Sequence, residues 1–261
     1  WVHNLETGKR KKIIRKEYQL EQIIDYSYPV LAWHPSGRIL TFITEEKGGL
    51  KLYYFTFGEK KLTERNLLYF EKVLDFSFSH DGSLMVLSAL KEGQTDIYIH
   101  NIASGTNHQI TNDIATDLTP RFISNSRQII FSSDRRSDSL SVAAGDDKIA
   151  MAKDLFIYDL VSKDDKLMRL SDDNYVDKLK PLEMGRNKFI SLSDRNGIIN
   201  RYYSEFDSTI SFVDTAVHYR YFAETRPLTD YPRNIMDHDY DKKAGMGAEI
   251  IFRDGRYYTY S

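Results

Sequence analysis

Residues 73–111, VLDFSFSHDGSLMVLSALKEGQTDIYIHNIASGTNHQIT, contain four short segments with the composition of β-strands. The segments 73–79 and 84–89 are rich in apolar and aromatic residues, and a His-Asp-Gly turn signal separates them. Segment 96–102 alternates apolar and polar residues, a Ser-Gly turn follows it, and 107–111 completes the unit. Nowhere in the chain is there a clear 3.6-residue periodicity, and only 20–24 could form a single helical turn. We therefore predict a unit of four antiparallel strands.

The same pattern recurs along the chain about every 45 to 60 residues. One series is an aromatic residue late in the first strand, represented by Trp33, Phe78 and Phe122. A second is a Leu/Ile-Thr/Ser pair near the end of each unit, at 62–63, 110–111, 170–171 and 228–229. A third is the alternating third strand, at 1–5, 52–58, 97–105, 156–163 and 218–222. Because the three series keep the same order, one structural unit is used several times.

Four short strands per repeat, separated by Gly and Asp turns, are typical of a β-propeller blade. We predict an all-β chain, a propeller of four-stranded antiparallel blades with about four full blades and a partial blade at each end. The full units are expected at 29–66, 73–113, 117–174 and 177–231, and the partial blades at 1–28 and 235–261. Insertions lengthen the third unit at 136–153 and the fourth around 205–216. A β-sandwich with chance repetition is the alternative.

The two ends of the sequence fall inside repeat units. The chain begins at Trp1, within a third strand, and ends at 256–261, which we expect to be another third strand. We expect a piece cut from a longer chain, although the two partial ends could also complete one blade and close a five-bladed ring.

Composition excludes several classes of function. The chain has 261 residues, with 36 Lys and Arg against 38 Asp and Glu, and a formal net charge of -2. This balance argues against a nucleic-acid partner, and the basic stretch 9–16 is typical of a charged edge strand. No apolar run approaches the ~18 residues of a membrane-spanning helix. The absence of Cys excludes disulfides, zinc–thiolate sites and a thiol nucleophile within these residues.

Two Ser-Asp-Arg motifs, with the pairs Asp134/Arg135 and Asp194/Arg195, are the first candidates for chemistry. Adjacent opposite charges could serve an active site, but their recurrence at equivalent positions favours a structural role, such as a tied turn or an ion pair. We assign them, with the aromatics Trp33, Phe78 and Phe122, to the repeat scaffold.

Metal and catalytic signatures are weak throughout. The His residues lack zinc-site spacing, and the acidic segment 237–241, DHDYD, lacks the EF-hand pattern that Ca²⁺ would need. We expect a solvated loop there and no cofactor or metal. No Gly-x-Ser-x-Gly elbow is present, so we predict a non-catalytic domain.

Partner binding is expected on the loop-bearing face around the central channel. The first candidates lie in the insertion of the third unit: Arg136, Ser137, Asp138, Asp146, Asp147 and Lys148. The second candidates lie in the acidic segment: Asp237, His238 and Asp239.

The repeat resembles the TolB-type, WD-like propeller repeat. The resemblance rests on Pro120–Phe122, on IIFSSDR at 129–135, on DLFIYDL at 154–160, and on their counterparts at 96–102 and 193–197, and it extends over residues 2–230. It implies a periplasmic, non-catalytic platform that binds outer-membrane lipoproteins and other envelope proteins. Residues 184–187, MGRN, replace the usual Asp-Gly turn, which with the insertions favours a divergent propeller within a larger Gram-negative envelope protein.

The blade also resembles the gating propeller of prolyl oligopeptidase-type serine peptidases, whose catalytic domain lies outside the propeller. A Gly-x-Ser-x-Gly motif elsewhere in the full-length chain would distinguish this alternative. Binding of a glycan or small ligand in the channel is supported only by the 34 aromatic residues (18 Tyr, 14 Phe and 2 Trp), which blade packing already explains.

Overall fold

The computed structural model describes residues 2–4, 6–13, 25, 27–140, 149–170, 175–213 and 217–261, and over 208–213 and 217–222 only the backbone. Segment 20–24, the one stretch whose sequence would allow a helical turn, lies outside the described residues, as do the candidates Asp146, Asp147 and Lys148.

Four antiparallel sheets of four strands, one of three and one of two make up the described chain. Blade I comprises β3 (Val30–Trp33), β4 (Ile39–Glu46), β5 (Gly49–Thr56) and β6 (Lys61–Asn66). Blade II comprises β7 (Lys72–Phe78), β8 (Leu84–Lys91), β9 (Gln94–Asn101) and β10 (Asn107–Gln109). Blade III comprises β11 (Asp117–Ile123), β12 (Gln128–Arg135), β13 (Ile149–Asp159) and β14 (Met168–Arg169).

Blade IV comprises β15 (Lys178–Gly185), β16 (Lys188–Ser193), β17 (Asn200–Val213) and β18 (Val217–Pro227). Blade V has three strands, β19 (Ile235–Asp241), β20 (Met246–Arg253) and β21 (Arg256–Tyr260), and β1 (Val2–His3) pairs with β2 (Arg10–Lys11). The predicted fold, an all-β propeller of about four full blades with a partial sheet at each end, is confirmed.

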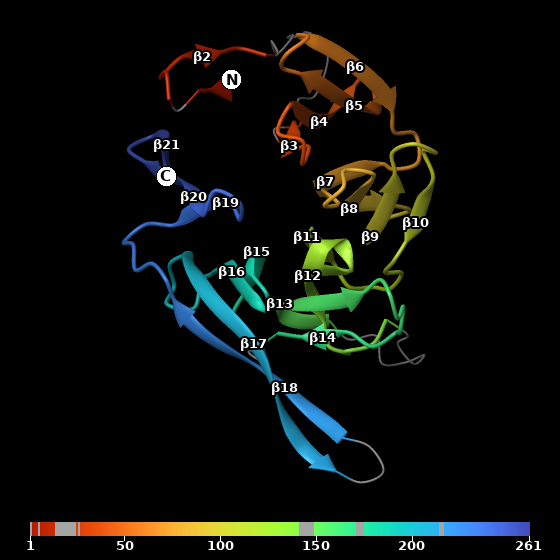
Figure 1. Ribbon diagram of the computed structural model, residues 1–261, viewed down its shortest axis with the longest axis vertical. Helices are drawn as coiled ribbons and strands as arrows, with labels where there is room; N and C mark the ends of the chain where they lie inside the picture. The colour runs from red at the N-terminus through yellow and green to blue at the C-terminus, as the bar shows by residue number, and fades with distance from the viewer. Residues whose placement is uncertain are drawn as a thin grey trace.

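The blades are arranged around a common centre (Figure 1). The first strand of each blade lies innermost, and the inner strands β3, β7, β11, β15 and β19 contact their neighbours in that order. The only helix among the described residues is a 3₁₀ turn, η1 (Ser124–Ser126), and none there has the length or apolar character to cross a bilayer.

The hydrophobic core lies between the blades, because each sheet buries both faces. On β8, Met85 and Leu87 pack with blade I residues, while Val86 between them packs with Phe131 and Phe156 of blade III. A third cluster joins blades III and IV. This radial packing accounts for the many aromatic and β-branched residues.

Two of the recurring sequence motifs meet through a hydrogen bond. In blade II the Thr111 hydroxyl donates to Asp96 Oδ1 at 3.2 Å and accepts from the Ile97 N–H at 2.9 Å. In blade IV the Thr229 hydroxyl donates to Asn200 Oδ1 at 2.9 Å and accepts from the Arg201 N–H at 2.9 Å. The Thr near the end of a unit therefore ties the outer strand to the start of the third strand.

The extra residues of blades III and IV partly lengthen strands, and the prediction of a solvated loop at 237–241 is wrong. Strand β13 begins at Ile149, so residues 149–153, at the end of the expected insertion, are part of a strand. The stretch around 205–216 extends β17 and β18 into a long hairpin, paired as far as Val213 and Val217, which projects from the propeller in Figure 1. The acidic segment 237–241 lies on strand β19 and is not a solvated loop.

Candidate functional site: the central channel

Four of the inner strands carry a β-bulge. The register shifts lie between Val73 and Asp75, between Leu118 and Arg121, between Leu179 and Leu182, and between Ile235 and Asp237. At two of them, Thr119 and Lys180 have a φ of 51°, which L-residues adopt rarely and β-branched residues more rarely still. Bulges redirect side chains and are frequent beside functional sites. Because four inner strands carry a bulge at a similar position, this height of the propeller centre is a candidate site.

Hydrogen bonds join the blades at the level of the bulges. The Ser77 hydroxyl donates to the Pro120 carbonyl at 3.1 Å, and the Lys180 N–H donates to Thr119 Oγ1 at 3.2 Å. The His238 ring contacts the Lys180 carbonyl through Nε2 at 2.7 Å. These bonds link β7 to β11, β11 to β15 and β15 to β19, so they form a belt along four of the five inner strands.

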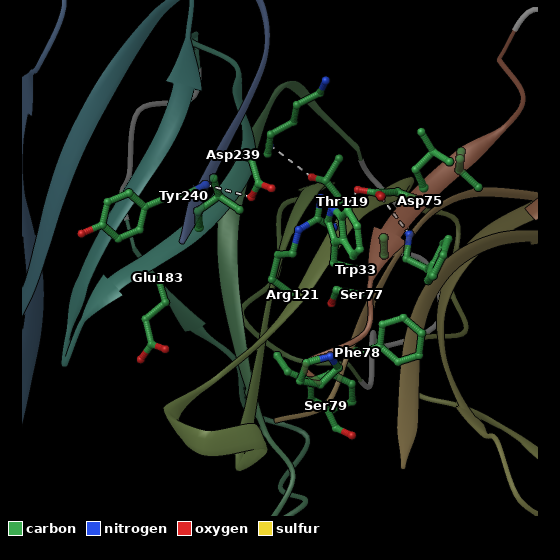
Figure 2. Close-up of a pocket in the computed structure, with 18 of the residues that line it drawn as sticks. Trp33, Asp75, Ser77, Phe78, Ser79, Thr119, Arg121, Glu183, Asp239 and Tyr240 are labelled. Carbon is green, nitrogen blue, oxygen red and sulfur yellow. Dashed lines mark hydrogen bonds and ion pairs between the residues drawn. The ribbon is translucent and has the colours of Figure 1, made fainter. Parts of the chain in front are cut away.

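The belt borders a channel with a volume of about 980 Å³, which is lined by residues of all five inner strands. Its wall on β3 and β7 is largely apolar, with Leu31, Trp33, Leu74 and Phe78. The wall formed by β11, β15, β19 and the turn after β19 is charged, with Arg121, Lys180, Glu183, Asp237, Asp239, Lys242 and Lys243. Figure 2 shows side chains from both walls, including Trp33 and Phe78 on one and Arg121 and Asp239 on the other.

Ion pairs between blades organise the charged groups. Arg121 Nη1 lies 2.7 Å from Asp75 Oδ2, Lys180 Nζ lies 2.7 Å from Asp237 Oδ1, and Lys242 Nζ lies 3.0 Å from Glu183 Oε2. Pairs that keep contact with solvent stabilise a fold by only ~0.2–1 kcal/mol each, so the main effect of these pairs is to position the side chains. The Asp239 carboxylate accepts the Tyr240 N–H at 2.8 Å.

His238 is a buried structural residue. Its Nε2 contacts a carbonyl oxygen, which can only accept, and its Nδ1 lies 3.3 Å from the Arg201 Nε–H, which can only donate. The ring is therefore the neutral tautomer with its proton on Nε2. Burial lowers its pKa to about 4. The predicted partner contacts Asp237, His238 and Asp239 all line the channel, and the buried His238 also ties β19 to β15.

The three repeat aromatics all line the channel. Trp33 is 49% exposed and stacks on Phe57 with the ring centroids 5.2 Å apart. Phe78 packs edge-on against His34 at 5.1 Å, and Phe122 packs at the margin of the core between blades II and III. These residues contribute to the scaffold, and they also line the channel.

The two Ser-Asp-Arg pairs lie away from the channel lining. Arg135 is buried against Asp113 and Asp117, and its guanidinium carbon lies 5.5 Å from the Phe131 ring centroid. Asp134 Oδ1 accepts the Thr116 N–H at 2.7 Å. Asp194 and Arg195 are exposed, and Asp194 Oδ1 accepts the Asp177 N–H at 3.2 Å.

The described part of the insertion in blade III lies against the outer edge of the blade. Arg136 Nε donates to the Ile149 carbonyl at 3.0 Å, and Asp138 pairs with Arg169 of β14 at 2.7 Å. Ser139 and Lys166 form an isolated antiparallel bridge. Arg136, Ser137 and Asp138 are therefore not brought to the channel, and a role for them in binding remains a prediction.

Sequence reasoning missed the channel-lining charges Asp75, Arg121, Lys180, Glu183 and Lys242. A signal was present for the first four, since each is a charged residue in an inner strand that also contains several apolar residues. Among the described residues, no group of His, Asp and Glu is arranged to hold a metal ion.

Comparison with solved structures places the fold. TolB from Acinetobacter baumannii matches with a TM-score of 0.57 at 17% identity, over 88% of this chain and 53% of that chain. A protein described as a TolB from Agrobacterium tumefaciens matches with a TM-score of 0.61 at 15% identity, over 86% of this chain and 69% of that chain. The fold is that of a TolB-like propeller.

Solved structures other than TolB also match this propeller. The tricorn protease matches with a TM-score of 0.58 at 13% identity, over 99% of this chain but 26% of that chain. The chain thus spans about half the length of the A. baumannii TolB structure and a quarter of the tricorn protease. Neither the family models nor the curated protein sequences gave a match.

Proposed function

We propose that this propeller is a non-catalytic protein–protein interaction scaffold that binds a polypeptide segment of its partner in the central channel. The observation that carries the proposal is the two-sided lining, with Trp33 and its apolar neighbours on one wall and arginine, lysine and carboxylate side chains on the other. A polypeptide offers apolar side chains and charged groups within one segment. Half-exposed aromatic residues are the type that anchors such contacts.

The proposed setting is a periplasmic or outer-membrane-associated assembly of a Gram-negative bacterium, with envelope proteins or lipoproteins as partners. The support is the fold shared with TolB structures together with the TolB-type repeat motifs. The charge of -2 and the ion-paired channel wall agree with a protein partner better than with a polyanion.

The test is quantitative co-purification of the full-length protein with envelope fractions, comparing wild type with W33A and R121A. We expect the same partner to be depleted about tenfold or more by the channel variants. The matched control is Y257A, which removes an exposed aromatic side chain from β21, away from the channel lining, and should retain the partner. Equal recovery by all four proteins would refute binding in the channel.

A second candidate is a propeller that gates substrate access to a peptidase domain elsewhere in the full-length chain. The match to the tricorn protease over 99% of this chain is the observation that favours it. A fluorophosphonate probe would label the full-length protein if it has an activated serine nucleophile. Labelling would support the gating propeller, and its absence would favour the scaffold.

A further inference from the structure

Three carboxylates and one guanidinium lie together between blades II and III. Asp96 is on β9, Asp113 is in the connection from β10 to β11, Asp117 begins β11, and Arg135 ends β12. The exposed fraction is 1% for Asp96, 0% for Asp117 and 3% for Arg135. When all three carboxylates are ionised, the cluster has an excess of negative charge in a largely buried site.

Arg135 serves only two of the three carboxylates. Its Nη1 donates to Asp113 Oδ2 at 3.0 Å, and its Nη2 donates to the two oxygens of Asp117 at 2.9 and 2.7 Å. Asp96 receives only neutral donors, the Thr111 hydroxyl at 3.2 Å and the Gln109 amide at 3.0 Å. No cation pairs with Asp96 in the described part of the chain, and the ion pairs of Arg135 go to Asp113 and Asp117.

The Thr111 hydroxyl has one hydrogen and faces two carboxylates, Asp96 and Asp117. While both are ionised, only one of them can receive that hydrogen. A proton on Asp96 removes the competition: the Asp96 O–H can donate to Thr111 Oγ1, and Thr111 can then donate to Asp117. The hydroxyl oxygen has a second lone pair for the Ile97 N–H that it already accepts at 2.9 Å.

We propose that the contact between blades II and III is an acid-strengthened joint behind the channel lining, which tightens when Asp96 gains a proton and loosens when Asp96 loses it. The adjacent inner strands β7 and β11 are held by the Ser77–Pro120 bond and the Asp75–Arg121 pair, so the joint lies behind the channel lining. Burial, followed by the charge of Asp117, raises the pKa of Asp96 from 3.8 to about 6. A raised pKa contributes stability that is present below pH 3.8 and is lost as the pH rises through 6.

The direct test is a titration of the Asp96 side-chain carboxyl by ¹³C NMR in the full-length protein. We expect a midpoint well above that of exposed aspartates, and a midpoint at or below about 4 would overturn the joint. The second test compares the Tm of wild type and D96N at about pH 5 and about pH 7.5. D96N should be more stable than wild type at the higher pH by several degrees, and this advantage should shrink at the lower pH.

The matched control is D81N, because hydrogen bonds from Ser79 and Ser83 lower the pKa of the exposed Asp81 to about 2. Its Tm difference from wild type should be the same at both pH values. If D96N and D81N respond alike, the joint is refuted. If D96N does not fold, the carboxyl titration of the wild-type protein decides alone.

Discussion

The two Ser-Asp-Arg motifs share a sequence and differ in their surroundings. Arg135 is enclosed between Asp113 and Asp117, whereas Arg195 lies exposed in the turn after β16. The residue at the start of the inner strand differs in charge: Asp117 in blade III and Lys178 in blade IV. Lys178 is itself buried, 3.3 Å from Asp154 of blade III. Lys178 occupies in blade IV the position that Asp117 occupies in blade III. Blade IV therefore has no buried carboxylate equivalent to Asp117, which pairs with Arg135.

The aspartates of the two motifs keep one shared role. Asp134 accepts the Thr116 N–H, and Asp194 accepts the equivalent Asp177 N–H. The motif therefore has a constant half, which fixes the entry into the inner strand, and a variable half, which depends on the charge of the neighbouring strand. Recurrence in a sequence indicates a shared backbone position, but it does not establish a shared electrostatic role.

The largest effect is expected for R135M. This substitution keeps apolar bulk but leaves Asp117 buried without its cation, and breaking a buried pair in this way costs about 3–5 kcal/mol. The free energy of unfolding from urea titration at neutral pH measures it. Burial raises the pKa of Asp117, so part of the loss should be recovered in acid. A loss below about 1 kcal/mol would contradict the importance of the enclosed arginine.

A smaller loss is expected for K178M, about 1–3 kcal/mol in the same titration. The physical reason is that Asp154 keeps a second cation, Arg169, whose Nη1 lies 3.9 Å from Asp154 Oδ2. A loss between that of R135M and that of an exposed variant would support the difference between the buried charges of blades III and IV. A loss equal to that of R135M would mean that Arg169 does not compensate.

Local patterns predicted most of the fold because strand alternation and Gly turns act within one blade. The prediction of a loop at 237–241 was wrong for a physical reason: Asp237 and Asp239 line the channel, and only His238 among the three is buried. A strand that borders water on its inner side has the polar composition of a loop. The stretch around 205–216 is predicted as an insertion, but its sequence gives no sign that the extra residues of β17 and β18 pair with each other.

The channel could not be predicted in the same way, because its lining is assembled from separate blades. Asp75 and Arg121 form an ion pair across 46 residues of sequence, and Lys180 and Asp237 across 57. The aromatic residues Trp33, Phe78 and Phe122 were identified as scaffold from their recurrence. Their exposure to the channel follows from the ring arrangement and not from any one repeat.

The joint between blades IV and V should respond to pH with the opposite sign to that between blades II and III. Burial lowers the pKa of His238 to about 4. Below pH 6.5 the unfolded chain therefore binds a proton on His238, while the imidazole of the folded protein stays neutral. Stability should therefore fall as the pH drops, by about 1 kcal/mol at pH 5.5. H238Q should flatten this dependence in urea titrations at several pH values. If H238Q left the slope of stability against pH unchanged, the pKa of His238 would not differ between the folded and unfolded states, and the expectation would be wrong.

The smallest effect is expected for R195M, within about 0.5 kcal/mol of wild type, because exposed substitutions rarely change stability more. D194A in the same motif should cost more, about 0.5–1.5 kcal/mol, because it removes the acceptor of the Asp177 N–H. Urea titration of both variants separates the constant half of the motif from the variable half. If R195M proved as costly as R135M, the two arginines would have the same role, and the charge at position 178 would not explain their different burial.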